Sequence, residues 1–118
     1  MDLKRALESY KWAEHLKNSL IMSSQLLASV PSYPENERGG ATRAVITVLE
    51  LLRGDAQRAS HATGEQPFLR AAEELSGAIS LAESREYGLA AERVGMAISQ
   101  VTTSAQGAWE RLSADGFV

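Results

Sequence analysis

The fold class is decided by residues 87–112, which read YGLAAERVGMAISQVTTSAQGAWERL. Apolar residues recur in this stretch alternately four and three positions apart, which is the spacing of one face of an α-helix. These residues are Tyr87, Ala91, Val94, Ile98, Val101, Ala105, Ala108 and Leu112. A 3.5-residue repeat kept over about four heptads is typical of helices that pack along their neighbours at a shallow angle. The stretch therefore predicts a long bundle helix.

The rest of the chain shows the same periodicity, and the predicted helices cover about 2–28, 41–60, 67–84 and 87–113. The first break, residues 29–40, holds Pro31, Pro34 and the pair Gly39-Gly40, which interrupt helices. The second break ends at Pro67, a residue favoured at the start of a helix. The third, residues 84–86, is short enough to require an antiparallel hairpin. We predict an all-α, single-domain four-helix bundle with up-down-up-down antiparallel topology.

Composition agrees with a thin helical core and argues against several classes of protein. The chain has 18 alanines, which favour helix and close packing. It has no cysteine, and therefore no disulfide framework, thiolate nucleophile or cysteine-ligated zinc. Fifteen acidic and twelve basic residues give a net charge of −3, which disfavours binding to a nucleic-acid backbone. No apolar run is long enough for a bilayer and no signal peptide is evident, so we expect a cytoplasmic protein without membrane partners.

The sequence shows no arrangement of residues suited to catalysis or metal binding. His15 and His61 are the two histidines, and neither has the Glu-x-x-His spacing of a di-iron bundle. No phosphate-binding glycine loop and no local signature of a catalytic triad is present. We therefore expect no catalytic residues, no metal and no cofactor, and the assignment as an enzyme is left open with a preference against it.

One polar line on the second predicted helix suggests an alternative function. Arg43, Glu50 and His61 lie on one side of this helix, together with Thr47 and Gln57. In a bundle interior, Arg43 could bind an anionic group and Glu50 could act as an acid or base. The line lies opposite the apolar face, so exposure to water is the simpler interpretation. The alternative is a small-molecule-binding or enzymatic bundle that uses Arg43, Glu50 and His61.

The favoured interpretation is a non-enzymatic interaction or assembly protein: an adaptor, a chaperone-like subunit or a structural subunit. We expect it to form a homodimer or to bind a helical protein partner. The first helix has a second apolar line beside its main one, and its candidate interface residues are Trp12, Met22, Leu26 and Val30. Tryptophan and methionine are enriched at the centres of protein interfaces.

Two alternatives to this surface stay open. A helix at the corner of a bundle touches two neighbours, so both apolar lines of the first helix could be internal. The last helix offers a competing dimer surface, because Gly88 and Gly95 lie seven residues apart, with Trp109 further along the same line. Each mid-helix glycine costs about 1 kcal/mol relative to alanine, and two on one line suggest the close approach of another backbone.

Overall fold

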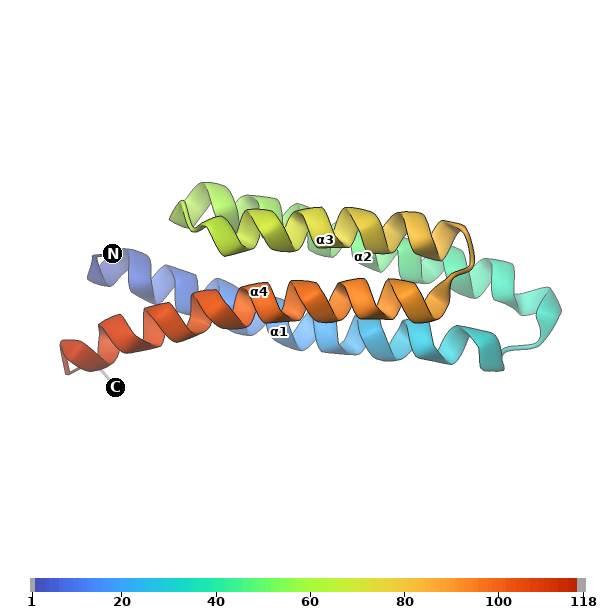
Figure 1. Cartoon of the computed structure of the whole chain (residues 1–118), viewed down its shortest axis with the longest axis horizontal. Coiled ribbons are helices and arrows are strands. Elements are labelled where there is room, and N and C mark those ends of the chain that lie inside the picture. Colours follow the sequence, from blue (N-terminus) through green and yellow to red (C-terminus); the bar gives the residue numbers. More distant parts are fainter. Residues whose placement is uncertain (1, 117–118) are drawn as a thin grey trace.

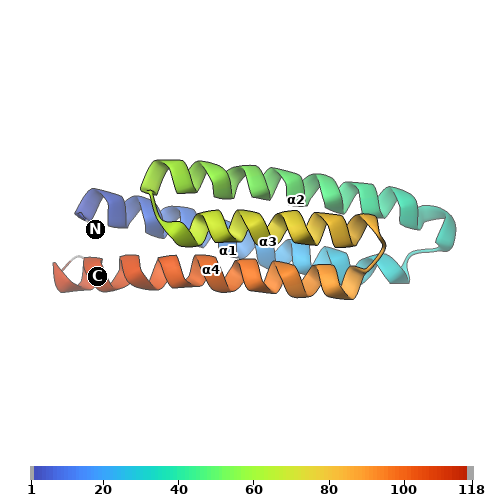
Figure 2. The ribbon, with the colours of Figure 1, turned by 45° about the horizontal axis from the view of Figure 1, so that its top comes forward.

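The computed structural model describes residues 2–116 and contains four long helices that run antiparallel in sequence order (Figures 1 and 2). The helices are α1 (Leu3–Ser29), α2 (Glu35–Thr63), α3 (Gln66–Glu83) and α4 (Tyr87–Ala114), with a short 3₁₀ turn, η1 (Val30–Ser32), after α1. The start of α1 and the end of α4 lie at the same end of the bundle. The predicted all-α, up-down-up-down four-helix bundle is confirmed.

The four helices form a closed ring in which each packs against two neighbours. The ring follows the order α1, α2, α3, α4, and the contact between α1 and α4 is the most extensive of the four. The contact between α1 and α2 is the least extensive. The bundle measures 54 × 22 × 17 Å, and a continuous apolar core runs along it. Phe68, at the start of α3, is the largest fully buried side chain.

The buried positions of α1 and α4, the most extensively packed pair of helices, are spaced as heptads and include many small residues. The buried positions of α1 are Ala6, Ser9, Ala13, Leu16, Leu20, Ser23 and Leu27, and those of α4 are Ala90, Val94, Ala97, Val101, Ser104, Ala108 and Leu112. Small side chains let neighbouring helices approach closely. The hydroxyl of Ser23 donates to the carbonyl of Leu20 at 2.8 Å. The hydroxyls of Ser9 and Ser104 are buried without a partner within the described residues.

The predicted register of the last helix is half right. Val94, Val101, Ala108 and Leu112 are buried as expected, but Ile98 is only partly buried. Ala97 and Ser104 are buried, whereas Ile98 and Ala105 of the predicted stripe are partly buried at the edge of the core. The buried side of α4 is therefore centred on smaller residues than the apolar spacing alone predicts.

The predicted start of the second helix is wrong, because α2 begins at Glu35 rather than near residue 41. Pro34 occupies the N-cap position, where its missing N–H is not needed, and its carbonyl accepts from the N–H groups of Glu37 and Arg38. Glu35 and Glu37 in the first turn are stabilised by the positive end of the helix dipole. These features carry the helix through Gly39 and Gly40, and the connection from α1 contracts to η1 and two further residues.

The two remaining connections follow known helix-ending geometries. Gly64 ends α2 in the left-handed conformation, with φ of 69°. At the end of α3, Arg85 takes that conformation with φ of 61°. The N–H of Glu86 donates to the carbonyl of Leu81, and that of Arg85 donates to the carbonyl of Ala82. This pair of bonds is a Schellman motif, which turns the chain directly from α3 into α4.

Replacing both Gly39 and Gly40 by alanine is expected to stabilise the protein by about 1–2 kcal/mol in total. Both lie inside α2, and nothing lies within 4 Å of a Cβ added to either. Alanine gains about 0.5–1 kcal/mol per site over glycine in a helix interior. Urea unfolding followed by circular dichroism measures the change. An unchanged or lowered free energy of unfolding would place these residues in a loop, as the sequence pattern suggested.

Candidate functional site: the groove between α1 and α2

An apolar groove lies where the ring of helices is least tightly closed, between α1 and α2. One hollow of about 680 Å³, open to solvent, lies along the middle of the two helices, and a second of about 370 Å³ continues it toward η1. Leu26 and Val48 line both hollows. We name this surface the α1–α2 groove. Its lining also includes Ser19, Met22, Ser23, Tyr33, Ala41, Ala44, Leu51 and Leu52.

Large apolar side chains stand exposed along the groove. Met22 on α1 is 64% exposed, Leu51 on α2 is 65% exposed, and Leu26 is 41% exposed. They lie at helical positions just outside the buried heptad positions, so they flank the core without entering it. Isolated exposed leucines are common on protein surfaces, whereas Met22, Leu26 and Leu51 lie together along one hollow.

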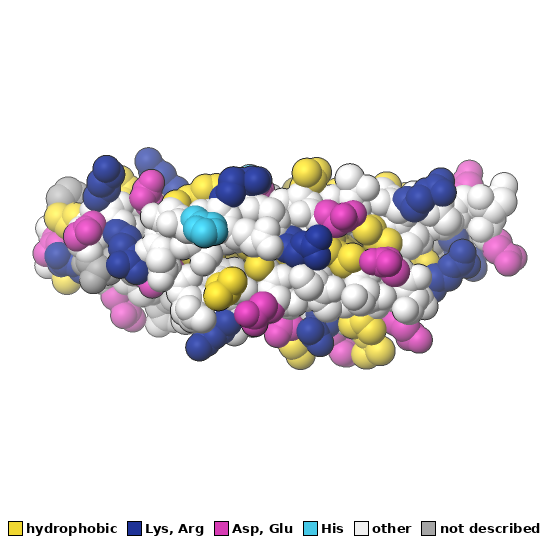
Figure 3. All heavy atoms as spheres, turned by 90° about the horizontal axis from the view of Figure 1, so that it is seen from above, with side chains coloured by type: hydrophobic (Ala, Val, Ile, Leu, Met, Phe, Trp, Pro, Cys, Tyr) yellow, Lys and Arg dark blue, Asp and Glu magenta, His cyan; other side chains and the backbone are white. Residues whose placement is uncertain are grey.

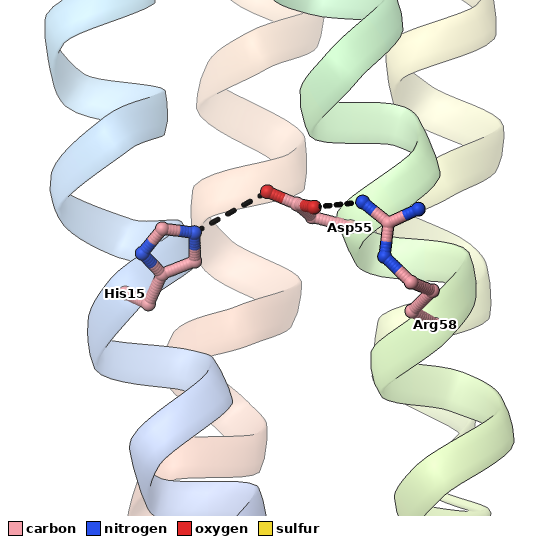
Figure 4. Close-up of polar contacts among 3 residues, drawn as sticks. All are labelled: His15, Asp55 and Arg58. Atoms are coloured by element: carbon pink, nitrogen blue, oxygen red, sulfur yellow. Dashed lines mark hydrogen bonds and ion pairs between the residues drawn. The ribbon is translucent and has the colours of Figure 1, made fainter.

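A chain of three polar residues closes one end of the groove (Figure 4). His15 on α1 lies across from Asp55 on α2, with 3.3 Å between its Nε2 and the carboxylate Oδ2. The other oxygen of Asp55 is paired with the guanidinium of Arg58, one turn along α2. His15 and Arg58 are exposed, whereas Asp55 is partly buried. This contact ties α1 to α2 where the apolar strip ends.

The opposite end of the groove opens into a shallow hollow beside the start of α2. Its lining includes Tyr33, Gly40, Ala41 and Arg43. Tyr33 and Ala41 also line the groove itself, so Arg43 stands at its edge. The Arg43 side chain is exposed. A cationic group therefore borders an otherwise apolar strip.

Three of the four predicted interface residues line this groove. Met22 and Leu26 are exposed there, and Val30 lines its end near η1. Trp12 is partly buried and packs against the main core. Val30 is itself fully buried, because it continues the buried heptad positions of α1 into η1. The role of these four residues in an interface stays a prediction.

The structure does not gather the predicted ligand-binding residues into one cavity. Arg43, Glu50 and His61 are all exposed on α2. Arg43 borders the groove, whereas His61 lies in a separate hollow with Arg58 and Leu69, between α2 and α3. Figure 3 views the α2–α3 side, where acidic and basic side chains are interspersed and hydrophobic ones form small separate patches. Within residues 2–116, no three histidine or acidic side chains are placed to hold a metal ion.

The groove residues on α2 were not predicted from the sequence. Leu51 is exposed and Val48 is partly buried, and both line the groove. A signal was present in the run Val48-Leu49-Glu50-Leu51-Leu52, which holds more apolar residues than one helix face can bury.

Comparison with protein-family models, with curated proteins and with solved structures finds no match for this chain. No helix in the described part of the chain combines the length and the apolar character that crossing a membrane requires. The groove and the remaining surface are therefore the features from which a function can be inferred.

Proposed function

We propose that this protein is a non-enzymatic interaction protein, and that its α1–α2 groove binds an amphipathic helix of a protein partner. The observation that carries the proposal is the apolar strip of Met22, Leu26, Val48 and Leu51 in a hollow between the least tightly packed pair of helices. Grooves of this kind commonly take the apolar face of a helix, and methionine adapts well to such contacts.

The shape and the ends of the groove specify the partner helix. On the α1 side of the groove, the stretch without charged residues runs from Ser19 to Ser29. It is about 15 Å long at 1.5 Å per residue. A helix of three turns spans this length, with apolar side chains at positions i, i+3 or i+4, and i+7. The exposed guanidinium of Arg43 favours an acidic side chain at that end of the partner. This proposal gives Arg43 a role in binding a protein.

A selection from a random library of helical peptides against the immobilised protein tests the proposal. We expect the enriched peptides to share the apolar spacing given above and to carry an acidic residue at one end. Fluorescence anisotropy then measures their binding to the parent protein and to the variant Leu51→Glu. Because a charge placed in an apolar contact is desolvated without a partner, we expect Leu51→Glu to weaken binding by about tenfold or more.

The matched control is Leu89→Glu on α4, which introduces the same charge at an exposed leucine away from the groove. This variant should bind the peptides as the parent does. Both leucines are exposed, so both variants should keep the parent's circular dichroism. Selected peptides that bind Leu51→Glu as tightly as the parent would show that the groove is not the site.

Four other predictions from the sequence have not been tested. The adaptor, chaperone-like or structural role is unspecified beyond helix binding, and the cytoplasmic location stays a prediction. The small-molecule alternative draws no support from the geometry, because Arg43, Glu50 and His61 do not converge. The homodimer is proposed on a different surface, described next.

A further inference from the structure

A second surface lies on the other side of α1, where α1 and α4 form a joint outer face. His15 marks the side of α1 turned toward α2, and the pair Arg93–Glu74, at 2.8 Å, marks the side of α4 turned toward α3. The opposite sides of both helices meet where Tyr10 and Trp109 stack, with ring centroids 6.0 Å apart. We name this surface the α1–α4 face. It comprises Leu7, Tyr10, Glu14, Lys17 and Ile21 of α1, and Gly88, Ala91, Gly95, Ile98, Thr102, Ala105 and Trp109 of α4.

The α4 half of this face is uncharged over its whole length and combines glycines with a large aromatic residue. Nothing lies within 4 Å of a Cβ added to Gly88 or Gly95, so packing within the chain does not require glycine at either position. Gly95 nevertheless destabilises the interior of α4 relative to alanine. Trp109, at the other end of the face, is 46% exposed. Along α4, the face therefore has a flat end with small residues, at Gly88 and Gly95, and a bulky end at Trp109.

The sequence of this face is complementary to itself under a two-fold rotation. Consider an axis that crosses α1 midway between Glu14 and Lys17, and crosses α4 midway between Ile98 and Thr102. These two midpoints lie at about the same level along the bundle. Ala6 of α1 packs in one cluster with Ala108 and Leu112 of α4, and this cluster is about equally far along α1 and along α4 from the two midpoints. The rotation lays α1 antiparallel on α1 of a second copy, and α4 antiparallel on α4.

In this arrangement bulky residues oppose small ones on α4. Trp109 lies opposite Ala91 of the second copy, between its Gly88 and Gly95, so the indole occupies the space that the glycines leave open. On α1, Tyr10 lies opposite Ile21 of the second copy. Aromatic side chains packed against small residues bury a large area, and tryptophan and tyrosine are enriched among residues that dominate binding energy.

Charges on the face are complementary under the same rotation. Glu14 and Lys17 form an ion pair at 3.1 Å within α1. They are the two charged residues of the α1–α4 face, and both lie at its centre. The axis places Glu14 of each copy opposite Lys17 of the other, which extends each pair into a four-residue network with no like-charge contact.

The size of the face is close to what a stable dimer needs. From Gly88 to Trp109 the face is about 32 Å long at 1.5 Å per residue. The bundle measures 22 × 17 Å in cross-section, so the face offers roughly 550–700 Å² per copy. Stable interfaces bury about 800 Å² per partner. We propose that a second copy of this chain binds the α1–α4 face, giving an antiparallel homodimer with two-fold symmetry.

Charge reversal at the centre of the face tests both the occupant and the register. We expect the parent to be a dimer in sedimentation velocity. Glu14→Lys alone and Lys17→Glu alone each place like charges opposite each other twice, and each should weaken self-association by about tenfold or more. Mixing the two variants should restore a dimer, since every contact across the axis is again of opposite charge. The double variant Glu14→Lys/Lys17→Glu should also dimerise. A monomeric parent, or a mixture that associates no more tightly than its components, would overturn the proposal.

A steric test uses the open space around the glycines of α4. Gly95→Leu adds a side chain on the face, and Gly107→Leu adds the same side chain on α4 but off the face. Neither Cβ has an atom within 4 Å in the single chain, so both variants should fold. We expect Gly95→Leu to be monomeric and Gly107→Leu to dimerise, and a Gly95→Leu dimer as tight as the parent contradicts the proposal.

Because this face and the α1–α2 groove lie on opposite sides of α1, Leu51→Glu should dimerise normally, which keeps the two proposals separately testable.

Discussion

Replacing Phe68 by alanine is expected to lower the free energy of unfolding by about 3–5 kcal/mol. Phe68 is fully buried and is the largest side chain in the core. It lies in the first turn of α3, directly after the Gly64 turn, where it packs within the main core cluster. Removing the ring loses its burial and leaves a cavity that the four surrounding helices can fill only in part. A loss of this size is a large share of the stability of a domain of this length.

Equilibrium urea unfolding measures this effect, and the neighbouring residue supplies the control. Leu69 follows Phe68 on the same helix but is 39% exposed. Leu69→Ala should lower the free energy of unfolding by less than about 1 kcal/mol. Equal losses in the two variants would show that α3 does not present Phe68 to the core.

Replacing Ala97 by leucine is expected to destabilise the protein by about 1–3 kcal/mol or more. Ala97 is fully buried in the main core cluster. Leucine adds three carbon atoms to a filled core, so α4 must move away from its neighbours or the new side chain must adopt a strained rotamer. The same substitution at Ala62, an exposed alanine of α2, serves as the control and should change stability by less than about 0.5 kcal/mol.

Thermal unfolding of these two variants also decides the register of α4. If Ile98 rather than Ala97 were buried in the core, as the apolar spacing alone suggests, Ala97→Leu would be tolerated. A melting temperature close to that of the parent would therefore restore the register predicted from the sequence.

The fold could be predicted from the sequence because its main determinant is periodic. The repeat through Val94, Val101 and Ala108 defines a bundle helix regardless of which neighbour it contacts. The start of α2 could not be predicted in the same way. Gly39 and Gly40 favour a break on their own, and the helix forms through them because Pro34 and the acidic first turn begin it earlier. Local propensity was outweighed by the helix start and by packing further along α2.

The candidate site was predicted in part, and the limits have a physical origin. Met22 and Leu26 were identified because α1 carries more apolar residues than one face needs. Val30 was placed on the same line, but it continues the buried heptad positions of α1 into η1 and is fully buried. Leu51 was missed because a groove is made by two helices, and the spacing within one helix does not show which flank of α2 meets α1.

The unequal closure of the helix ring has a consequence for how the molecule moves. Separating two adjacent helices requires breaking the contacts between them, and α1 and α2 share the fewest. Local opening follows the route of lowest free energy, so we expect α1 and α2 to separate from each other first, while α3 and α4 stay packed. At one end of this contact, Asp55 of α2 binds His15 of α1 and Arg58. At the other end, η1 leads from α1 toward α2. A helix bound in the groove would bridge both sides of this contact, so occupancy would slow amide hydrogen exchange in α1 and α2 more than in α3 and α4.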